Sequence, residues 1–166
     1  MQNDFVTGVL GNADTHAIVP AMVKKLTSFQ GEIIFTKDTH DSNYLNTQEG
    51  TNLPVEHCLK GTYGHDLIPE LEAISKKRNA LVFEKSCFGS IGLATYLKEQ
   101  WDKGEIQSIA LCGVCTDICV ISNAMLIKAY IPECPLLVLK DLCAGLTPQK
   151  HAHALDVMNS CQIASI

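Results

Sequence analysis

The run Ser108-Ile109-Ala110-Leu111-Cys112-Gly113-Val114-Cys115-Thr116-Asp117-Ile118-Cys119 leads from an apolar β-like segment into a helical pattern. It predicts that Cys119 lies in the first turn of a helix, just beyond the end of a buried strand. Unpaired amide N–H groups and the helix dipole favour negative charge at such a position. They would stabilise the thiolate of Cys119, which is its nucleophilic form, and also the oxyanion formed when a thiolate attacks a carbonyl.

Strand-like and helix-like segments alternate along the rest of the chain. Short runs that are apolar on both faces predict buried strands at 33–36, 80–83, 109–112, 136–139 and 162–165. Helical patterns cover 18–29, 92–101, 119–130 and 148–159, the last with Thr147 as its N-cap. The alternation predicts a single α/β domain over 1–166, in which an open parallel sheet lies between helices in three layers. Ligands bind beyond the carboxyl ends of the strands in such sheets.

Composition excludes several classes of protein. The chain has 166 residues, 46% of them hydrophobic, and a net charge of −5, which fits neither a disordered chain nor a basic nucleic-acid surface. We find no apolar run of membrane-spanning length and no signal peptide pattern. Eight cysteines in such a chain indicate reduced thiols of a cytoplasmic protein, most of them filling the core.

Metal-ligating side chains follow the first predicted strand. Asp38 and His40 alternate along an extended segment, so both can point the same way. The long irregular stretch 39–63 adds Glu49 and His57, and its length indicates a function. Carboxylates and imidazoles are ligands of zinc, manganese and iron(II). We expect one divalent metal here, zinc first; the alternative is that Glu49 and His57 are solvated loop residues.

Two further features leave alternatives open. Lys85 ends an apolar strand, where it either holds a thiolate or substrate carbonyl in place or is a surface lysine. Cys112 and Cys115 have the spacing of a redox dithiol. Because Cys112 is expected within the strand, a buried strand thiol is the preferred interpretation.

These elements, in this order, resemble the isochorismatase-like cysteine hydrolases, especially their nicotinamidase branch. The resemblance extends over nearly the whole chain. Its motifs are Gln2-Asn3-Asp4-Phe5 after the family's first strand, Lys37-Asp38-Thr39-His40 and Glu56-His57-Cys58 in its metal site, Glu84-Lys85 at the catalytic lysine, and Gly113-Val114-Cys115-Thr116-Asp117-Ile118-Cys119 at the nucleophile.

The resemblance implies an Asp–Lys–Cys triad, with Cys119 as the nucleophile and Lys85 as the lysine. Main-chain amides of Cys115 and Cys119 would form the oxyanion hole, and a cis peptide bond would join Val114 to Cys115. The family's aspartate falls one residue before Met1, and the apolar first strand is absent too. We expect the natural polypeptide to extend upstream with both, and a chain lacking the aspartate to be inactive.

The resemblance also implies a metal held by Asp38, His40 and His57, with Glu49 as an additional ligand. In nicotinamidases this metal binds the pyridine nitrogen and orients the ring. Candidate substrate-lining residues, unless they belong to the core, are Phe5, Leu10 and Phe88.

The leading interpretation is hydrolysis of nicotinamide to nicotinate and ammonia through a thioester. We expect a cytoplasmic homo-oligomer of NAD salvage, with no nucleic-acid or membrane partner. The first alternative is the same chemistry on another small amide or ureido compound. A vinyl-ether hydrolase is disfavoured because the nucleophilic cysteine is present. A catalytically silent homologue and a thiol oxidoreductase are the remaining alternatives.

Overall fold

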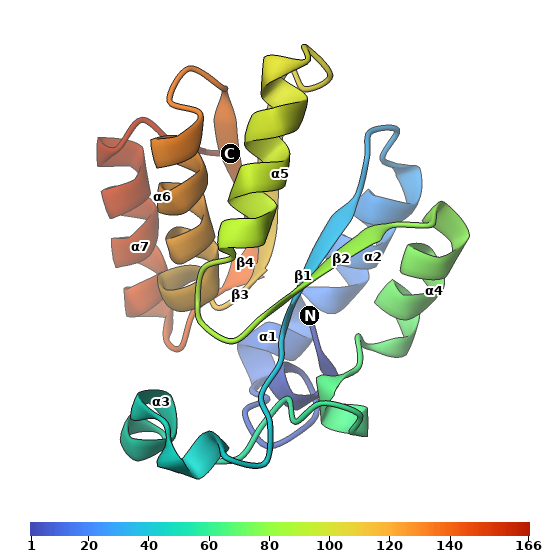
Figure 1. Ribbon diagram of the computed structural model, residues 1–166, viewed down its shortest axis with the longest axis vertical. Coiled ribbons are helices and arrows are strands. Elements are labelled where there is room, and N and C mark those ends of the chain that lie inside the picture. Colours follow the sequence, from blue (N-terminus) through green and yellow to red (C-terminus); the bar gives the residue numbers. More distant parts are fainter. The chain divides into compact units, whose positions relative to one another are not determined.

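The computed structural model describes residues 1–166 and divides into two compact units, Met1–Ser86 (unit 1) and Cys87–Ile166 (unit 2). In Figure 1, unit 1 runs from blue to green, and unit 2 continues through yellow to red. All strand pairs are parallel, and helices connect the strands in each unit. The predicted α/β class, with parallel sheets flanked by helices, is therefore confirmed.

Unit 1 is built around two strands, β1 (Ile34–Asp38) and β2 (Leu81–Lys85), which pair in register so that Asp38 faces Lys85. Its helices are α1 (Ala13–Ala17), α2 (Val19–Ser28), α3 (Gln48–Asn52) and α4 (Pro69–Arg78), with single 3₁₀ turns η1 (Asn3–Phe5), η2 (Tyr44–Asn46) and η3 (Tyr63–His65). Helix α4 begins with Pro69 and is capped at its C-terminus by Asn79, which adopts the left-handed conformation common at helix C-termini.

Unit 2 has three strands in the order β3 (Ile109–Val114), β4 (Leu136–Ala144) and β5 (Ala164–Ser165). The π-helical turn η4 (Thr116–Val120) follows β3 directly, and the helices are α5 (Ile91–Asp102), α6 (Ile121–Tyr130) and α7 (Pro148–Ser160). Helix α6 lies beside both α5 and α7 (Figure 1). The core of unit 2 includes the buried side chains of Ala124, Ile127, Val138, Met158 and Ile163.

Three expectations about these elements were wrong. The helix predicted from Cys119 begins at Thr116, because the carbonyl of Cys115 accepts from the amides of both Ile118 (3.1 Å) and Val120 (3.0 Å) and widens the first turn. The stretch 39–63 contains η2 and α3 and is not wholly irregular. Strand β2 is an edge strand of its two-stranded sheet, and it exposes the apolar side chains of Leu81 and Val82 instead of burying both faces.

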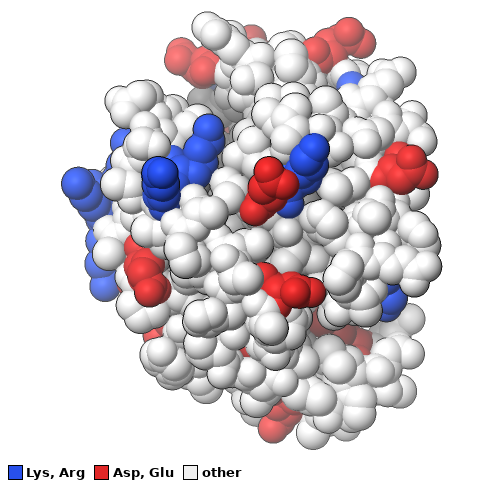
Figure 2. All heavy atoms as spheres, turned by 180° about the vertical axis from the view of Figure 1, so that it is seen from behind, with Lys and Arg blue, Asp and Glu red and all other residues white.

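The surface carries charges of both signs. On the face drawn in Figure 2, acidic groups lie among basic ones and most of the area is uncharged. No helix combines the length and apolar character that crossing a bilayer requires.

Candidate functional site

Three of the predicted metal ligands lie together in unit 1. Asp38 is the last residue of β1, and the candidate ligand atoms of Asp38, His40 and His57 all lie within 4.8 Å of one another. All three side chains are buried. A backbone bridge joins the two histidine segments, since the His40 amide donates to the Cys58 carbonyl at 3.0 Å and the His40 carbonyl accepts from Lys60 at 2.8 Å.

The two imidazoles of this cluster each present Nε2 to the same carboxylate. His57 Nδ1 donates to the Val55 carbonyl at 2.9 Å, which leaves the lone pair on Nε2. Glu49 Oε1 lies 3.7 Å from His57 Nε2 and 3.9 Å from His40 Nε2. The structure therefore brings Glu49, the fourth predicted ligand, to the edge of the cluster.

The residues of the cluster fit a divalent metal. His40 Nε2 is a buried polar atom without a hydrogen-bond partner, and such an orphaned group is costly unless something binds it. Burial, the largest influence, lowers the pKa of His40 below its ordinary value, which favours the neutral ring that a metal requires. Two imidazole nitrogens and two carboxylates form a donor set that suits zinc, manganese or iron(II).

Aromatic rings enclose the two histidines. Tyr44 is 1% exposed, and its ring centroid lies 4.8 Å from that of His40 and 5.0 Å from that of His57. Its hydroxyl donates to the Leu53 carbonyl at 2.9 Å, and burial raises its pKa. Phe5, a predicted substrate-lining residue, meets the His57 ring edge-on at 5.7 Å. Sequence reasoning missed Tyr44, whose only signal is an aromatic residue shortly after Asp-x-His.

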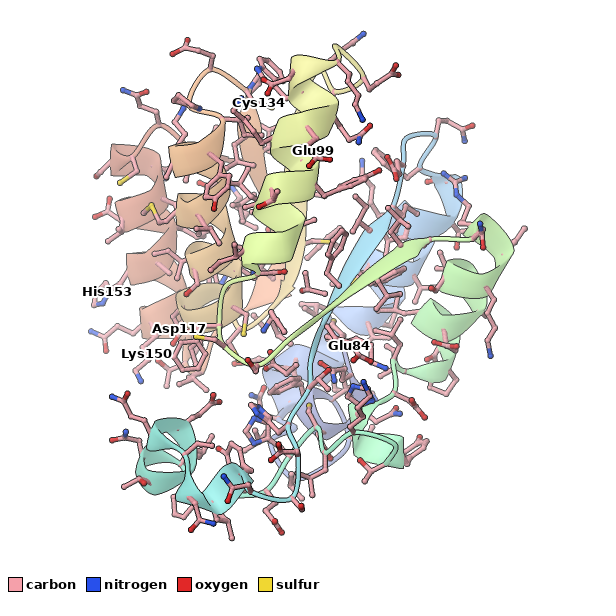
Figure 3. The ribbon with its side chains drawn as sticks, in the orientation of Figure 1. Glu84, Glu99, Asp117, Cys134, Lys150 and His153 are labelled. Carbon is pink, nitrogen blue, oxygen red and sulfur yellow. The ribbon has the colours of Figure 1, made fainter.

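Lys85, the expected catalytic lysine, is buried at the carboxyl end of β2 and donates a hydrogen bond to Asp38 Oδ1. Its surface-lysine alternative is therefore excluded. The neighbouring Glu84, labelled in Figure 3, instead pairs with Lys60 at 2.7 Å on the surface. Thr39, which follows Asp38 directly, connects the ends of β1 and β2, because its amide donates to the Lys85 carbonyl at 2.8 Å.

The predicted nucleophile lies in unit 2. Cys119 is partly buried within η4, one helical turn beyond the end of β3. The peptide bond between Val114 and Cys115 is cis, as the resemblance implied. Asn123 holds this turn: its Nδ2 donates to the carbonyls of Cys119 at 2.8 Å and Phe88 at 3.1 Å. Sequence reasoning singled out no role for Asn123.

Two side chains fasten the start of η4 to the segment around α7. Thr116, fully buried, shares a 2.8 Å hydrogen bond with Nδ1 of His151. Asp117 Oδ1 accepts a hydrogen bond from the Leu146 amide at 2.9 Å. Figure 3 labels Asp117 close to Lys150 of α7. These contacts, which the sequence did not predict, fix the backbone on which Cys119 is carried.

The remaining predicted residues have less distinctive surroundings. Leu10 is partly buried, and its amide donates to the Asp4 carbonyl at 2.9 Å. Phe88 is 41% exposed. Cys112 lies within β3, and burial raises its pKa, which disfavours the redox dithiol. Burial also raises the pKa of Cys143 on the neighbouring strand to about 12.

Comparison with known proteins agrees with this arrangement. The family model described as the isochorismatase domain matches residues 1–165. A Bacillus subtilis protein named as an uncharacterized isochorismatase family protein, PncA, is 32% identical over 167 residues, which cover 92% of this chain and 87% of that protein. A Schizosaccharomyces pombe nicotinamidase is 25% identical over 199 residues, covering 100% of this chain and 89% of its own.

The fold also matches a solved structure. The pyrazinamidase/nicotinamidase of Streptococcus mutans UA159 superposes with a TM-score of 0.83 at 27% identity, covering 99% of this chain and 95% of that one. The chain belongs to the isochorismatase family of hydrolases. The relatives that it matches include a nicotinamidase and a pyrazinamidase/nicotinamidase, which confirms the resemblance to the nicotinamidase branch drawn from the sequence.

Proposed function

We propose that this protein is a cysteine amidohydrolase that converts nicotinamide to nicotinate and ammonia. The observation that carries the proposal is the buried cluster of Asp38, His40 and His57, with its unpartnered imidazole nitrogen. A metal set of this kind is the feature by which the nicotinamidase branch differs from many family members with other substrates. Two of the matched relatives, named as nicotinamidase and pyrazinamidase/nicotinamidase, support the same choice.

One divalent transition metal would be held by Asp38, His40 and His57, with Glu49 as an additional ligand. Zinc is the first choice for this mixed nitrogen and oxygen set, with manganese and iron as alternatives. When bound, the metal would supply a Lewis-acid contact for the ring nitrogen of the substrate. Phe5, which meets the His57 ring, would contact the substrate there, and Leu10 and Phe88 complete the proposed lining.

The proposed chemistry is covalent catalysis by Cys119. Its sulfur attacks the carboxamide carbon while the amides of Cys115 and Cys119 donate to the developing oxyanion. The aspartate of the triad that the resemblance implies would take the proton of the thiol and pass it to the nitrogen as the C–N bond breaks, so that ammonia leaves. Water attacks the thioester, nicotinate is released, and the thiol is restored. Lys85 is the proposed lysine of the Asp–Lys–Cys triad that the resemblance implies.

The test is ammonia release from nicotinamide by the zinc-loaded full-length protein, with nicotinate identified by chromatography. Parallel assays use a carbamoyl compound and a ureido compound. Turnover of those compounds but not of nicotinamide would replace the proposed substrate with the first alternative. Absence of turnover on every amide would favour a catalytically silent homologue. The expected cytoplasmic location, role in NAD salvage and homo-oligomeric state belong to the same proposal.

A further inference from the structure

We propose that Gln2 and Asp4 are positioning residues of the metal centre, an inference that rests on the proposed metal site in unit 1. Neither side chain belongs to the ligand cluster. Each instead binds the backbone of a ligand segment: Gln2 binds Asp38 itself, and Asp4 binds the residue after His57. The N-terminal segment thus holds both of the chain segments from which the ligands come.

Gln2 holds both backbone polar groups of Asp38. The Gln2 side chain is 3% exposed; its Nε2 donates to the Asp38 carbonyl at 2.8 Å, and its Oε1 accepts from the Asp38 amide at 2.8 Å. The same Nε2 also donates to the His65 carbonyl at 2.8 Å. A side chain that satisfies both groups of one residue fixes the place from which the Asp38 carboxylate projects.

Asp4 acts through the backbone of Cys58. Its Oδ2 accepts from the Cys58 amide at 2.7 Å, and a charged acceptor makes this bond stronger than a neutral one. Cys58 has a φ of +47°, a left-handed conformation that costs free energy for a residue with a side chain. The bond to Asp4 therefore holds a strained residue that follows His57 directly.

The backbone of Cys58 also binds the second histidine ligand, His40. The Cys58 carbonyl accepts from the His40 amide at 3.0 Å, so the amide of Cys58 binds Asp4 and its carbonyl binds a ligand residue. With His57 on its other side, Cys58 connects Asp4 to both imidazole ligands. Loss of the Asp4 carboxylate would loosen both.

The space around the Asp4 carboxylate is made by two glycines. A β-carbon at Gly8 would lie 2.5 Å from Asp4 Oδ1, and one at Gly64 would lie 2.1 Å from Oδ2. Neither distance is possible for real atoms, so the carboxylate occupies a slot that exists because positions 8 and 64 lack side chains. This fit distinguishes Asp4 from an acid that merely lies on a loop.

The experiment measures zinc affinity of the intact chain by competition with a chromophoric chelator, and ligand geometry from the visible spectrum of the cobalt(II) form. We expect Asp4→Ala and Gln2→Ala to weaken zinc binding about 10- to 100-fold, as losses of outer-shell partners do. Asp4→Asn keeps an acceptor for the Cys58 amide and should recover most of the affinity. Asn3→Ala is the matched control, because Asn3 is as buried as Gln2 but its side chain donates to the Tyr63 carbonyl at 2.8 Å and not to the backbone of a ligand or of its neighbour.

The outcomes separate this inference from the metal site on which it rests. Wild-type protein that binds no metal would overturn the metal centre and the inference together. Wild-type metal binding with unchanged affinity and cobalt spectrum in Asp4→Ala and Gln2→Ala would overturn the inference alone. An equal loss in Asn3→Ala would also overturn it, because the effect would then be general destabilisation. Gln2→Ala carries the test if Asp4→Ala does not fold.

Discussion

Lys85 donates a hydrogen bond from Nζ to Oδ1 of Asp38, directly across the parallel pair of β1 and β2, in which the two residues are in register. Both side chains are buried. The expected catalytic lysine is thus an ion-pair partner of a proposed metal ligand. Removal of the Lys85 ammonium or the Asp38 carboxylate would leave the other charge buried without this partner, which costs folding free energy.

We predict that Lys85→Met lowers the free energy of unfolding of the metal-free protein by about 3–5 kcal/mol. Saturating zinc should make the loss smaller, because a cation on Asp38 replaces the missing ammonium. Chemical denaturation with and without zinc measures both. Lys60→Met is the control, since Lys60 pairs with Glu84 at the surface and should cost about 1 kcal/mol or less. A loss in Lys85→Met that zinc leaves unchanged would contradict the prediction.

In the full-length protein, Cys119→Ala should abolish amide hydrolysis and leave the circular dichroism spectrum unchanged. Without the sulfur no thioester forms, so we expect ammonia release to fall by about 10³-fold or more. Cys161→Ala, an exposed thiol at the end of α7, is the matched control and should keep wild-type turnover. Turnover in Cys119→Ala close to that of the control would remove Cys119 as the nucleophile.

Elemental analysis tests the metal ligands. We predict one divalent transition metal per wild-type chain and far less in His40→Ala, because His40 contributes a buried nitrogen that has no hydrogen-bond partner. His153→Ala, which changes an exposed histidine of α7, should bind as much metal as the wild type. The assignment fails if His40→Ala and His153→Ala contain equal amounts.

Gly50→Ala should disturb the metal site through α3. A β-carbon at position 50 would lie 2.1 Å from the Tyr44 carbonyl, so the helix that carries Glu49 must move. We expect a loss of about 1–3 kcal/mol in the free energy of unfolding, and weaker zinc binding. Gly89→Ala is the control, because its β-carbon would have an ordinary 3.5 Å contact with the Ser122 carbonyl. Wild-type zinc affinity in Gly50→Ala would show that α3 need not be fixed.

The stability of the metal-free protein should fall as pH decreases. Burial is the main cause that lowers the pKa of His65 below its ordinary 6.5, so the unfolded chain takes up the proton first. Stability is therefore lost as pH falls through 6.5 toward the lower folded value, and His40 adds to the loss in the same direction.

Denaturation between about pH 7.5 and pH 5.5 measures this slope. His65→Gln can keep a hydrogen bond to Thr39, whose hydroxyl lies 2.8 Å from His65 Nε2, but it does not titrate. It should show a shallower slope than the wild type, and His153→Gln should not. Identical slopes in all three proteins would remove His65 as a source of the pH dependence.

Much of the fold could be predicted because its signals are local. Apolar runs located the strands, and Thr147 before Pro148 located the start of α7, where the Thr147 hydroxyl accepts from the Lys150 amide at 3.1 Å. Alternation along the chain also placed Asp38 and His40 in one cluster. Helix α4 was missed because half of its 10 residues are charged and it buries only Leu71, Ile74 and Ser75.

The supporting contacts of the site could not be predicted, because they depend on residues far apart in sequence. Gln2 and Asp38 are separated by 36 positions, and Asp4 and Cys58 by 54. Neither pair has a spacing or periodicity that marks it. The π-helical turn at Thr116 likewise depends on the Cys115 carbonyl, which accepts hydrogen bonds from two amides, and no residue pattern predicts this.

The slot that receives the Asp4 carboxylate makes three positions depend on one another. While Asp4 is present, a methyl group gained at Gly8 or Gly64 meets a carboxylate oxygen. Once Asp4 is replaced by a smaller residue, the obstacle disappears at Gly64, whereas a β-carbon at Gly8 would still lie 2.7 Å from the Cα of residue 4. The order in which substitutions arrive therefore decides which ones the chain accepts, and divergence in this segment should proceed by paired replacements, with position 4 changing first.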